Sequence, residues 1–181
     1  MDSIAALFRT LGAPLHNERW SWGASTDDYV ILRAWQDDMR KAEKGMRVLI
    51  LKSIYQDRDL TNRNGYKERE KHIAEIEQGK SVYVVMCRAV DPKVQPRDIF
   101  SFEKKDLFVG GSVIRVEDES VELELVDRVS VREFRKQRSI DKMYWTLLKL
   151  HSMTTRTRNL NFYPWSEIKW QMFPSNFSTF A

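Results

Sequence analysis

Basic and aromatic side chains are interleaved toward the C-terminus of the chain. Seven cations accumulate there with few carboxylates between them: Arg128, Arg132, Arg135, Lys136, Arg138, Lys142 and Lys149. Aromatic residues follow the same stretch, at Tyr144, Trp145, Phe162, Tyr163, Trp165, Trp170 and Phe173. Cations bind phosphate groups and rings stack on bases, so the mixture is typical of a surface that binds nucleic acid. The alternative is that the rings cover the core and the cations alone are exposed.

Three tryptophans and a short polar run form a second group. Trp20 and Trp22 are two residues apart and therefore lie on one side of an extended chain. A turn at Asp27 and Asp28 would fold the next apolar run back, which brings Trp35 near the other two rings. Polar residues flank these rings: Ser21, Gln36, Asp37 and Asp38. The alternative is that the tryptophans are ordinary packing residues of a hairpin.

Composition sets the broad limits. A chain of 181 residues forms one domain, or a small domain with an extension. A formal net charge of +4 and a pI near 9.2 permit a polyanionic partner without requiring one. The single cysteine, Cys87, lies in an apolar run, so we expect a buried core residue and neither a disulfide nor a cysteine zinc site within one chain.

Sequence motifs exclude several enzyme classes. The chain has no HxxxH, GxSxG or phosphate-loop glycine pattern, and we therefore expect no catalytic residue, no metal site and no cofactor. The N-terminal residues lack the basic start and long apolar run of a secretion signal, and no segment has the length and apolarity of a membrane span. These features predict a cytoplasmic protein without a membrane partner.

A helix followed by a buried strand is the central unit. Apolar residues recur in threes and fours from Tyr66 to Gln78, which predicts an amphipathic helix that ends at Gly79. The run Ser81 to Ala89 is almost uninterruptedly apolar, which predicts a strand buried on both faces.

Further elements are predicted around this unit. We expect a helix capped by Ser3 and ending at Leu11, another helix from Ile140 to Met153, and five further strands: Tyr29–Trp35, Arg47–Ile54, Ser112–Val116, Val121–Val126 and Val129–Phe134. This content predicts an α+β fold, with a small partly open β-barrel and flanking helices. We expect the barrel domain to span residues 1–134 and a basic, aromatic helical extension to span residues 135–181.

A resemblance to a known superfamily follows the order of several motifs. These are RWSWGA, LRAWQDD, GYKEREKHIAEIEQGKSVYVVMCRAVDPKVQPRDIFSF and FVGG. Over Leu11 to Val131 the pattern resembles PUA-like modules, a superfamily that includes the EVE, YTH, ASCH and SRA domains, as found with bacterial HNH-type restriction endonucleases. No segment resembles the HNH metal motif, so the resemblance implies a reader domain without a nuclease of its own.

The resemblance implies a site for an extruded or modified base. Trp20, Trp22 and Trp35 would stack on the base, while the edge would be read by Ser21, Gln36, Asp37 and Asp38. The phosphate backbone would be bound by Arg69, Arg97, Arg132, Arg135 and Arg138. The implied partner is DNA rather than RNA, in a restriction or phage-defence setting that a separate nuclease subunit would complete.

Two alternatives come from other classes of protein. Asp91, Glu103 and Lys105 follow the order of a magnesium-dependent PD-(D/E)xK nuclease, in which two carboxylates hold the metal and a lysine positions water. The other alternative is a protein-interaction module whose basic C-terminal part docks on an acidic partner.

Overall fold

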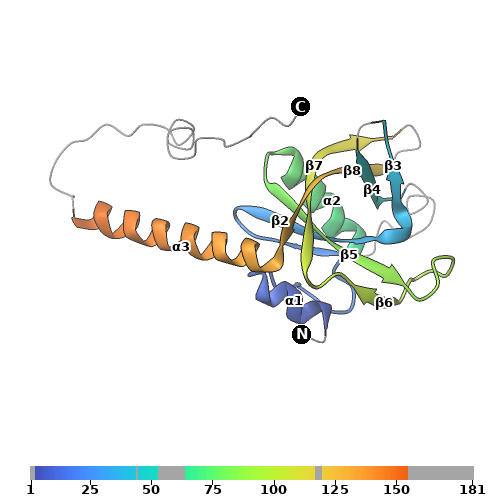
Figure 1. The fold of residues 1–181 in the computed structure, drawn as a ribbon, viewed down its shortest axis with the longest axis horizontal. Helices are drawn as coiled ribbons and strands as arrows, with labels where there is room; N and C mark the ends of the chain where they lie inside the picture. The colour runs from blue at the N-terminus through green and yellow to red at the C-terminus, as the bar shows by residue number, and fades with distance from the viewer. Residues whose placement is uncertain (1–2, 44, 53–63, 117–119, 155–181) are drawn as a thin grey trace, which may run out of the picture. The chain divides into compact units, whose positions relative to one another are not determined.

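A computed structural model describes residues 3–43, 45–52, 64–116 and 120–154. The described part is α+β, as predicted (Figure 1). Its α-helices are α1 (Ile4–Thr10), α2 (Asn64–Glu77) and α3 (Val131–Thr154), and a 3-10 turn covers Gln36–Asp38. Its strands are β1 (Gly23–Ser25), β2 (Tyr29–Trp35), β3 (Met39–Lys41), β4 (Met46–Leu51), β5 (Ser81–Ala89), β6 (Ile99–Phe102), β7 (Asp106–Arg115) and β8 (Val121–Ser130).

The strands form one open, mostly antiparallel sheet. Its order is β1-β2-β5-β7-β8-β4-β3, and β6 pairs with β5 beside β7. Within the described residues β2 and β5 form the one parallel pair, joined through α2. β1 and β3 lie at the two ends of this order, so the described sheet is not closed, and the small, partly open barrel stays a prediction.

The sheet carries a hydrophobic cluster on each face. Along β2 the side chains alternate, with Val30 and Leu32 in one cluster and Tyr29 and Ile31 in the other. α2 packs on the first face through Tyr66, Ile73 and Ile76. α1 and the first turn of α3 pack on the second face through Leu7, Phe8, Val131 and Phe134. We call these the α2 face and the α1 face.

The central unit of the sequence is confirmed. α2 is followed by Gly79, whose φ of +100° suits a residue without a Cβ. β5 then pairs with β2 on one edge and with β6 and β7 on the other. The cap of α1 is also confirmed, because the Ser3 hydroxyl accepts a hydrogen bond from the Ala6 N–H at 3.1 Å.

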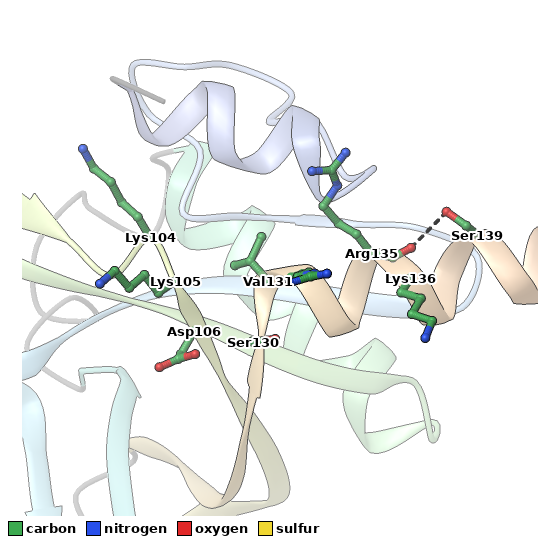
Figure 2. A pocket seen from close by; sticks show the side chains of 9 residues that line it. Lys104, Lys105, Asp106, Ser130, Val131, Arg135, Lys136 and Ser139 are labelled. Carbon is green, nitrogen blue, oxygen red and sulfur yellow. Dashed lines mark hydrogen bonds between the residues drawn. The ribbon is translucent and has the colours of Figure 1, made fainter.

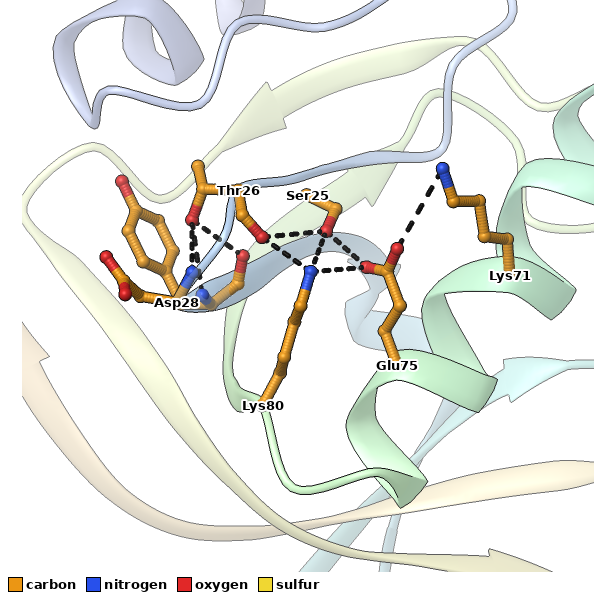
Figure 3. A network of polar contacts seen from close by, with 7 residues as sticks. Ser25, Thr26, Asp28, Lys71, Glu75 and Lys80 are labelled. Atoms are coloured by element: carbon orange, nitrogen blue, oxygen red, sulfur yellow. Dashed lines mark hydrogen bonds and ion pairs between the residues drawn. The ribbon is translucent and has the colours of Figure 1, made fainter. Parts of the chain in front are cut away.

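A polar network fastens the β1–β2 turn to the end of α2 (Figure 3). Lys80 Nζ donates to the Thr26 carbonyl at 2.6 Å and lies 3.3 Å from a Glu75 carboxylate oxygen. The Ser25 hydroxyl donates to the same carboxylate. Burial opposes ionisation of Glu75, but the hydrogen bonds from Ser25 and Lys80 outweigh it and lower the pKa of Glu75.

The strand predicted over Val129–Phe134 is wrong. β8 ends at Ser130, and α3 begins at Val131. The physical reason is a reciprocal capping pair between Ser130 and Glu133, the S-x-x-E pattern of a helix start. The helix expected over Ile140–Met153 lies within α3.

The strand predicted over Arg47–Ile54 is present as β4, although residues 53 and 54 lie outside the described ranges. Residues 1–139 form one compact unit, and α3 from Ile140 to Thr154 is the described part of a second. The predicted boundary after residue 134 falls inside α3.

Candidate nucleic-acid interface

A break in sheet pairing presents two lysines at the surface. β5 pairs with β7 at Val84–Phe108 and with β6 at Cys87–Phe102. Between these two pairs β5 advances by three residues, whereas the chain opposite it, from Phe102 to Phe108, advances by six. The three additional residues bulge out of the ladder between β6 and β7. Lys104 and Lys105 lie in this bulge and are exposed, and the chain returns to the core at Leu107.

The start of α3 lies against the same bulge. The Val131 N–H donates to the Lys105 carbonyl at 2.7 Å, and Asp106 pairs with Ser130 in the β7–β8 ladder. Val131 and Phe134 are buried on the α1 face. Because these two residues anchor one side of the helix, the other side projects exposed Arg132, Arg135 and Lys136.

These side chains surround one open depression of about 650 Å³. Its lining comprises Lys104, Lys105, Asp106, Ser130, Val131, Arg132, Arg135, Lys136 and Ser139. Figure 2 shows the two lysines of the bulge on one side and Arg135 and Lys136 of α3 on the other. We call this surface the basic depression. Five cations and one carboxylate line it.

The cations of the basic depression lie around one hollow and are not neutralised by ion pairs among the described residues. None of the five forms an ion pair within the part of the chain that the structure describes. Some cations elsewhere on the surface are paired, as in Arg40–Glu122 and Arg115–Glu77. Unpaired cations in one hollow produce a positive potential that attracts an anion.

Two of the five arginines predicted to bind phosphate lie in this depression, Arg132 and Arg135. Arg138 is engaged elsewhere, because its guanidinium pairs with Asp28 at 2.8 Å and lies over the Tyr29 ring. Arg97 pairs with Asp38 at 2.8 Å, with its side chain only 7% exposed. The structure therefore does not gather the five arginines on one surface.

Arg69 does not fit a role in phosphate binding. It is 2% exposed, and Nη2 donates to the carbonyls of Trp22 and Arg33 at 2.7 and 2.8 Å. Burial, followed by repulsion from Arg33, lowers the pKa of Arg69 to about 9. The side chain joins α2 to the β1–β2 hairpin from inside the domain.

His72 lies one turn after Arg69 on the same buried side of α2. Its ring faces β1, where a Cβ on Gly23 would lie 3.2 Å from Cε1 and Nδ1. Burial and the charge of Arg69 lower the pKa of His72 to about 3, so the ring is neutral at neutral pH. The position fits a core histidine.

The three tryptophans are not brought together. Trp22 packs against the cluster of the α2 face, while Trp35 packs against the cluster of the α1 face. Trp22 sits at the start of α2, where a Cβ on Gly65 would lie 2.6 Å from its Nε1. The Trp20 ring meets His16 edge-on, with centroids 5.7 Å apart. A cage built from all three rings does not fit this arrangement.

The polar residues of the predicted base site also separate. Ser21 is fully buried, and its hydroxyl accepts from the Asn17 N–H at 2.9 Å. Asp38 pairs with both Arg97 and Lys52, so its charge is neutralised. Gln36 and Asp37 are exposed on the turn that follows Trp35. Of the predicted site, Trp35, Asp38 and Arg97 form one contact group, since the Arg97 guanidinium also lies 5.5 Å from the Trp35 ring centroid.

The residues of the nuclease alternative lie on surface turns. Asp91 follows β5 and Glu103 follows β6, and both are exposed. Among the described residues no three acidic, histidine or cysteine side chains gather as a metal-binding group. Cys87 is buried, and burial raises the pKa of its thiol to about 12.

The grouping of Lys104 and Lys105 with α3 was not predicted. The sequence signal is the pair of lysines between two apolar runs, combined with the S-x-x-E cap that starts a basic helix 25 residues later. Tyr144 and Trp145 are both exposed, at 58% and 49%. The other aromatics of the C-terminal stretch, Phe162 to Phe173, lie outside the described residues.

Comparison with known proteins identifies no family. No family model, no curated protein and no solved structure matches the chain. In the described part of the chain, no helix combines the length and apolarity needed to cross a membrane.

Proposed function

We propose that this protein binds nucleic acid, and that the basic depression contacts the phosphate backbone. The observation that carries the proposal is the set of five unpaired cations around one open hollow. An open, charged surface suits an extended polyanion better than a small ligand, because small-molecule sites are enclosed and mostly apolar. Arg132 and Arg135 act from α3, and Lys104 and Lys105 act from the bulge.

The resemblance to PUA-like modules supports a finer form of this proposal. In that form the chain is a reader of a modified or flipped base in DNA, within a restriction or phage-defence system. Recognition of a base edge should be tested at Trp35 and at the exposed Gln36 and Asp37. Ser21 and Trp22 are less suitable, because Ser21 is buried and Trp22 packs against the core. The open sheet, with helices on both faces, is compatible with a partly open barrel of this kind.

The test is a binding titration with a matched control. Arg132→Ala/Arg135→Ala removes two charges from the basic depression, and Lys67→Ala/Lys71→Ala removes two from the exposed side of α2, which covers the opposite face of the sheet. Non-specific affinities are of order 10⁻⁴ to 10⁻⁶ M at physiological salt. We expect the first variant to weaken binding to labelled DNA about tenfold or more, and the second to bind like the wild type. Equal affinities for all three proteins would refute the proposal.

A second titration tests the reader. Duplexes carrying cytosine, 5-methylcytosine, 5-hydroxymethylcytosine, adenine or N6-methyladenine are compared at fixed salt, with and without EDTA. A preference for one duplex that survives EDTA supports a reader. Cleavage that appears with magnesium would instead favour the nuclease alternative and direct attention to Asp91, Glu103 and Lys105.

A further inference from the structure

Phe100 is an exposed aromatic ring at a second irregularity of the same sheet edge. In the β5–β6 ladder Arg88 pairs with Ser101 and Ala89 pairs with Ile99, so Phe100 is an extra residue without a position opposite it. A bulge of this kind turns a side chain away from the side of the strand that the regular alternation would give it. The ring of Phe100 is 69% exposed, the highest value among the large apolar residues of the described chain.

The ring and the basic depression lie along one continuous stretch. Phe102 follows two residues later and is half-buried on the α1 face. Lys104 Nζ lies 5.3 Å from the centroid of the Phe102 ring and also lines the basic depression. Along this stretch Phe100 comes first. Phe102 follows, with the Lys104 ammonium group over its ring, and Lys104 and Lys105 then lead into the basic depression. At about 3.4 Å per residue, Phe100 and Lys104 are at most about 14 Å apart along the chain.

Among the described strands β6 pairs with β5 alone, so its other edge carries no strand. β6 pairs with β5, while β8 pairs with β7 and turns into α3 at Ser130. A strand of nucleic acid that leaves the basic depression can therefore continue along Phe102 to Phe100. Both bulges serve this arrangement, since one presents the cations and the other presents the ring.

An exposed ring beside cations favours single-stranded over double-stranded nucleic acid. In a duplex the faces of the bases are covered by their neighbours, whereas a single strand can place a base face on an aromatic side chain. Stacking does not discriminate strongly among bases, because every base has a flat face. A ring that is exposed beside unpaired cations satisfies both requirements of single-strand binding.

We propose that the ligand of this surface is single-stranded nucleic acid, with one base stacked on Phe100 and the adjoining phosphates in the basic depression. The inference rests on the proposed function and names its substrate class. The charge of Lys104, Lys105, Arg132 and Arg135 favours this occupant over an apolar or basic protein partner.

The experiment separates stacking from apolarity at position 100. Phe100→Leu keeps an apolar side chain but removes the ring, and Phe100→Trp keeps a ring. Val94→Ala is the matched control, because Val94 is also exposed, at 53%, in the neighbouring β5–β6 loop. Each protein is titrated with a labelled oligothymidine and with a duplex of the same length at the same salt.

The wild type should bind the oligothymidine more tightly than the duplex. Phe100→Leu should weaken binding to the oligothymidine about 5- to 100-fold, while Phe100→Trp and Val94→Ala should bind like the wild type. Far-UV circular dichroism of each variant checks that the fold is kept.

Three outcomes would overturn the inference. If Phe100→Leu binds the oligothymidine like the wild type while Arg132→Ala/Arg135→Ala loses binding, the single-strand site is wrong and the proposed function stands. If none of these variants changes binding, both are wrong. Tighter binding of the duplex by the wild type also contradicts the single-strand assignment.

Discussion

Ser130 and Glu133 cap α3 reciprocally at the edge of the basic depression. The Ser130 hydroxyl donates to Glu133 Oε2 at 2.7 Å, and the Glu133 N–H donates to Ser130 Oγ at 3.1 Å. The pair stops β8 and starts a helix within one residue. It therefore decides whether Arg132 and Arg135 lie beside Lys104 and Lys105 or continue along a strand.

Replacing the cap should loosen this junction. We expect Ser130→Ala to lower the free energy of unfolding by about 1 kcal/mol, because one helix N–H loses its acceptor. Ser139→Ala is the control, since its hydroxyl donates to the Arg135 carbonyl inside the helix and caps nothing. Thermal unfolding of the two variants measures the difference. Equal melting temperatures would show that the cap contributes little.

Gly65→Ala should destabilise the protein although alanine is the better helix former. In an ordinary helix this change stabilises by roughly 0.5–1 kcal/mol. Here the new Cβ would lie 2.6 Å from Nε1 of the Trp22 indole and 2.9 Å from the Trp20 carbonyl, so the chain before β1 must move. We expect a lower melting temperature, with exposed Lys67→Ala on the same helix as the control. A higher melting temperature for Gly65→Ala would mean that the Trp22 loop does not pack closely on α2.

Arg69→Met should destabilise the fold by about 2–3 kcal/mol, because a charged donor that serves two carbonyls is lost. Denaturant unfolding measures this change. DNA binding by the fraction that stays folded should equal that of the wild type, since Arg69 is buried. A variant of wild-type stability that fails to bind DNA would restore the predicted phosphate role of Arg69.

His72 should make stability depend on pH. Its folded pKa of about 3 lies below the ordinary value of 6.5, so the unfolded chain binds the proton more readily than the folded protein. The free energy of unfolding is therefore unaffected by His72 above pH 6.5 and falls as the pH drops toward 3. The loss is at most about 1.4 kcal/mol per pH unit.

The pH effect is best measured between pH 6.5 and 5, above the range in which most carboxylates titrate. Denaturant unfolding of the wild type should show the fall in stability, and His72→Gln should reduce it. The control is His16→Gln, because His16 is exposed and its ring packs edge-to-face with Trp20. A pH dependence unchanged in His72→Gln would show that the ring is accessible to protons in the folded state.

Much of the fold could be predicted because its signals are local. The period of α2, the glycine after it and the apolar run of β5 are each read within a few residues. The bulges at Phe100 and at Lys104–Lys105 could not be predicted, because they depend on how a second strand aligns with β5. The β8–α3 junction could have been predicted, since S-x-x-E is a sequence pattern for the start of a helix.

The candidate site was predicted only in part. Arg132 and Arg135 were expected to bind phosphate, and they lie in the basic depression. The tryptophan cage assumed regular alternation from Trp20 through the hairpin, but β1 begins at Gly23, so Trp22 lies before the ladder and packs on the α2 face. The burial of Arg69 depends on two carbonyls from the hairpin, which no pattern within α2 reveals.

The most direct test of nucleic-acid binding by the basic depression is the salt dependence of affinity. The slope of log K against log salt concentration is measured for the wild type and for Arg132→Ala/Arg135→Ala. If both arginines contact phosphates of a single strand, the slope should become shallower by about 1.4. The Lys67→Ala/Lys71→Ala control should keep the wild-type slope. Equal slopes for the wild type and the arginine variant would contradict the account, because the phosphates would then lie elsewhere.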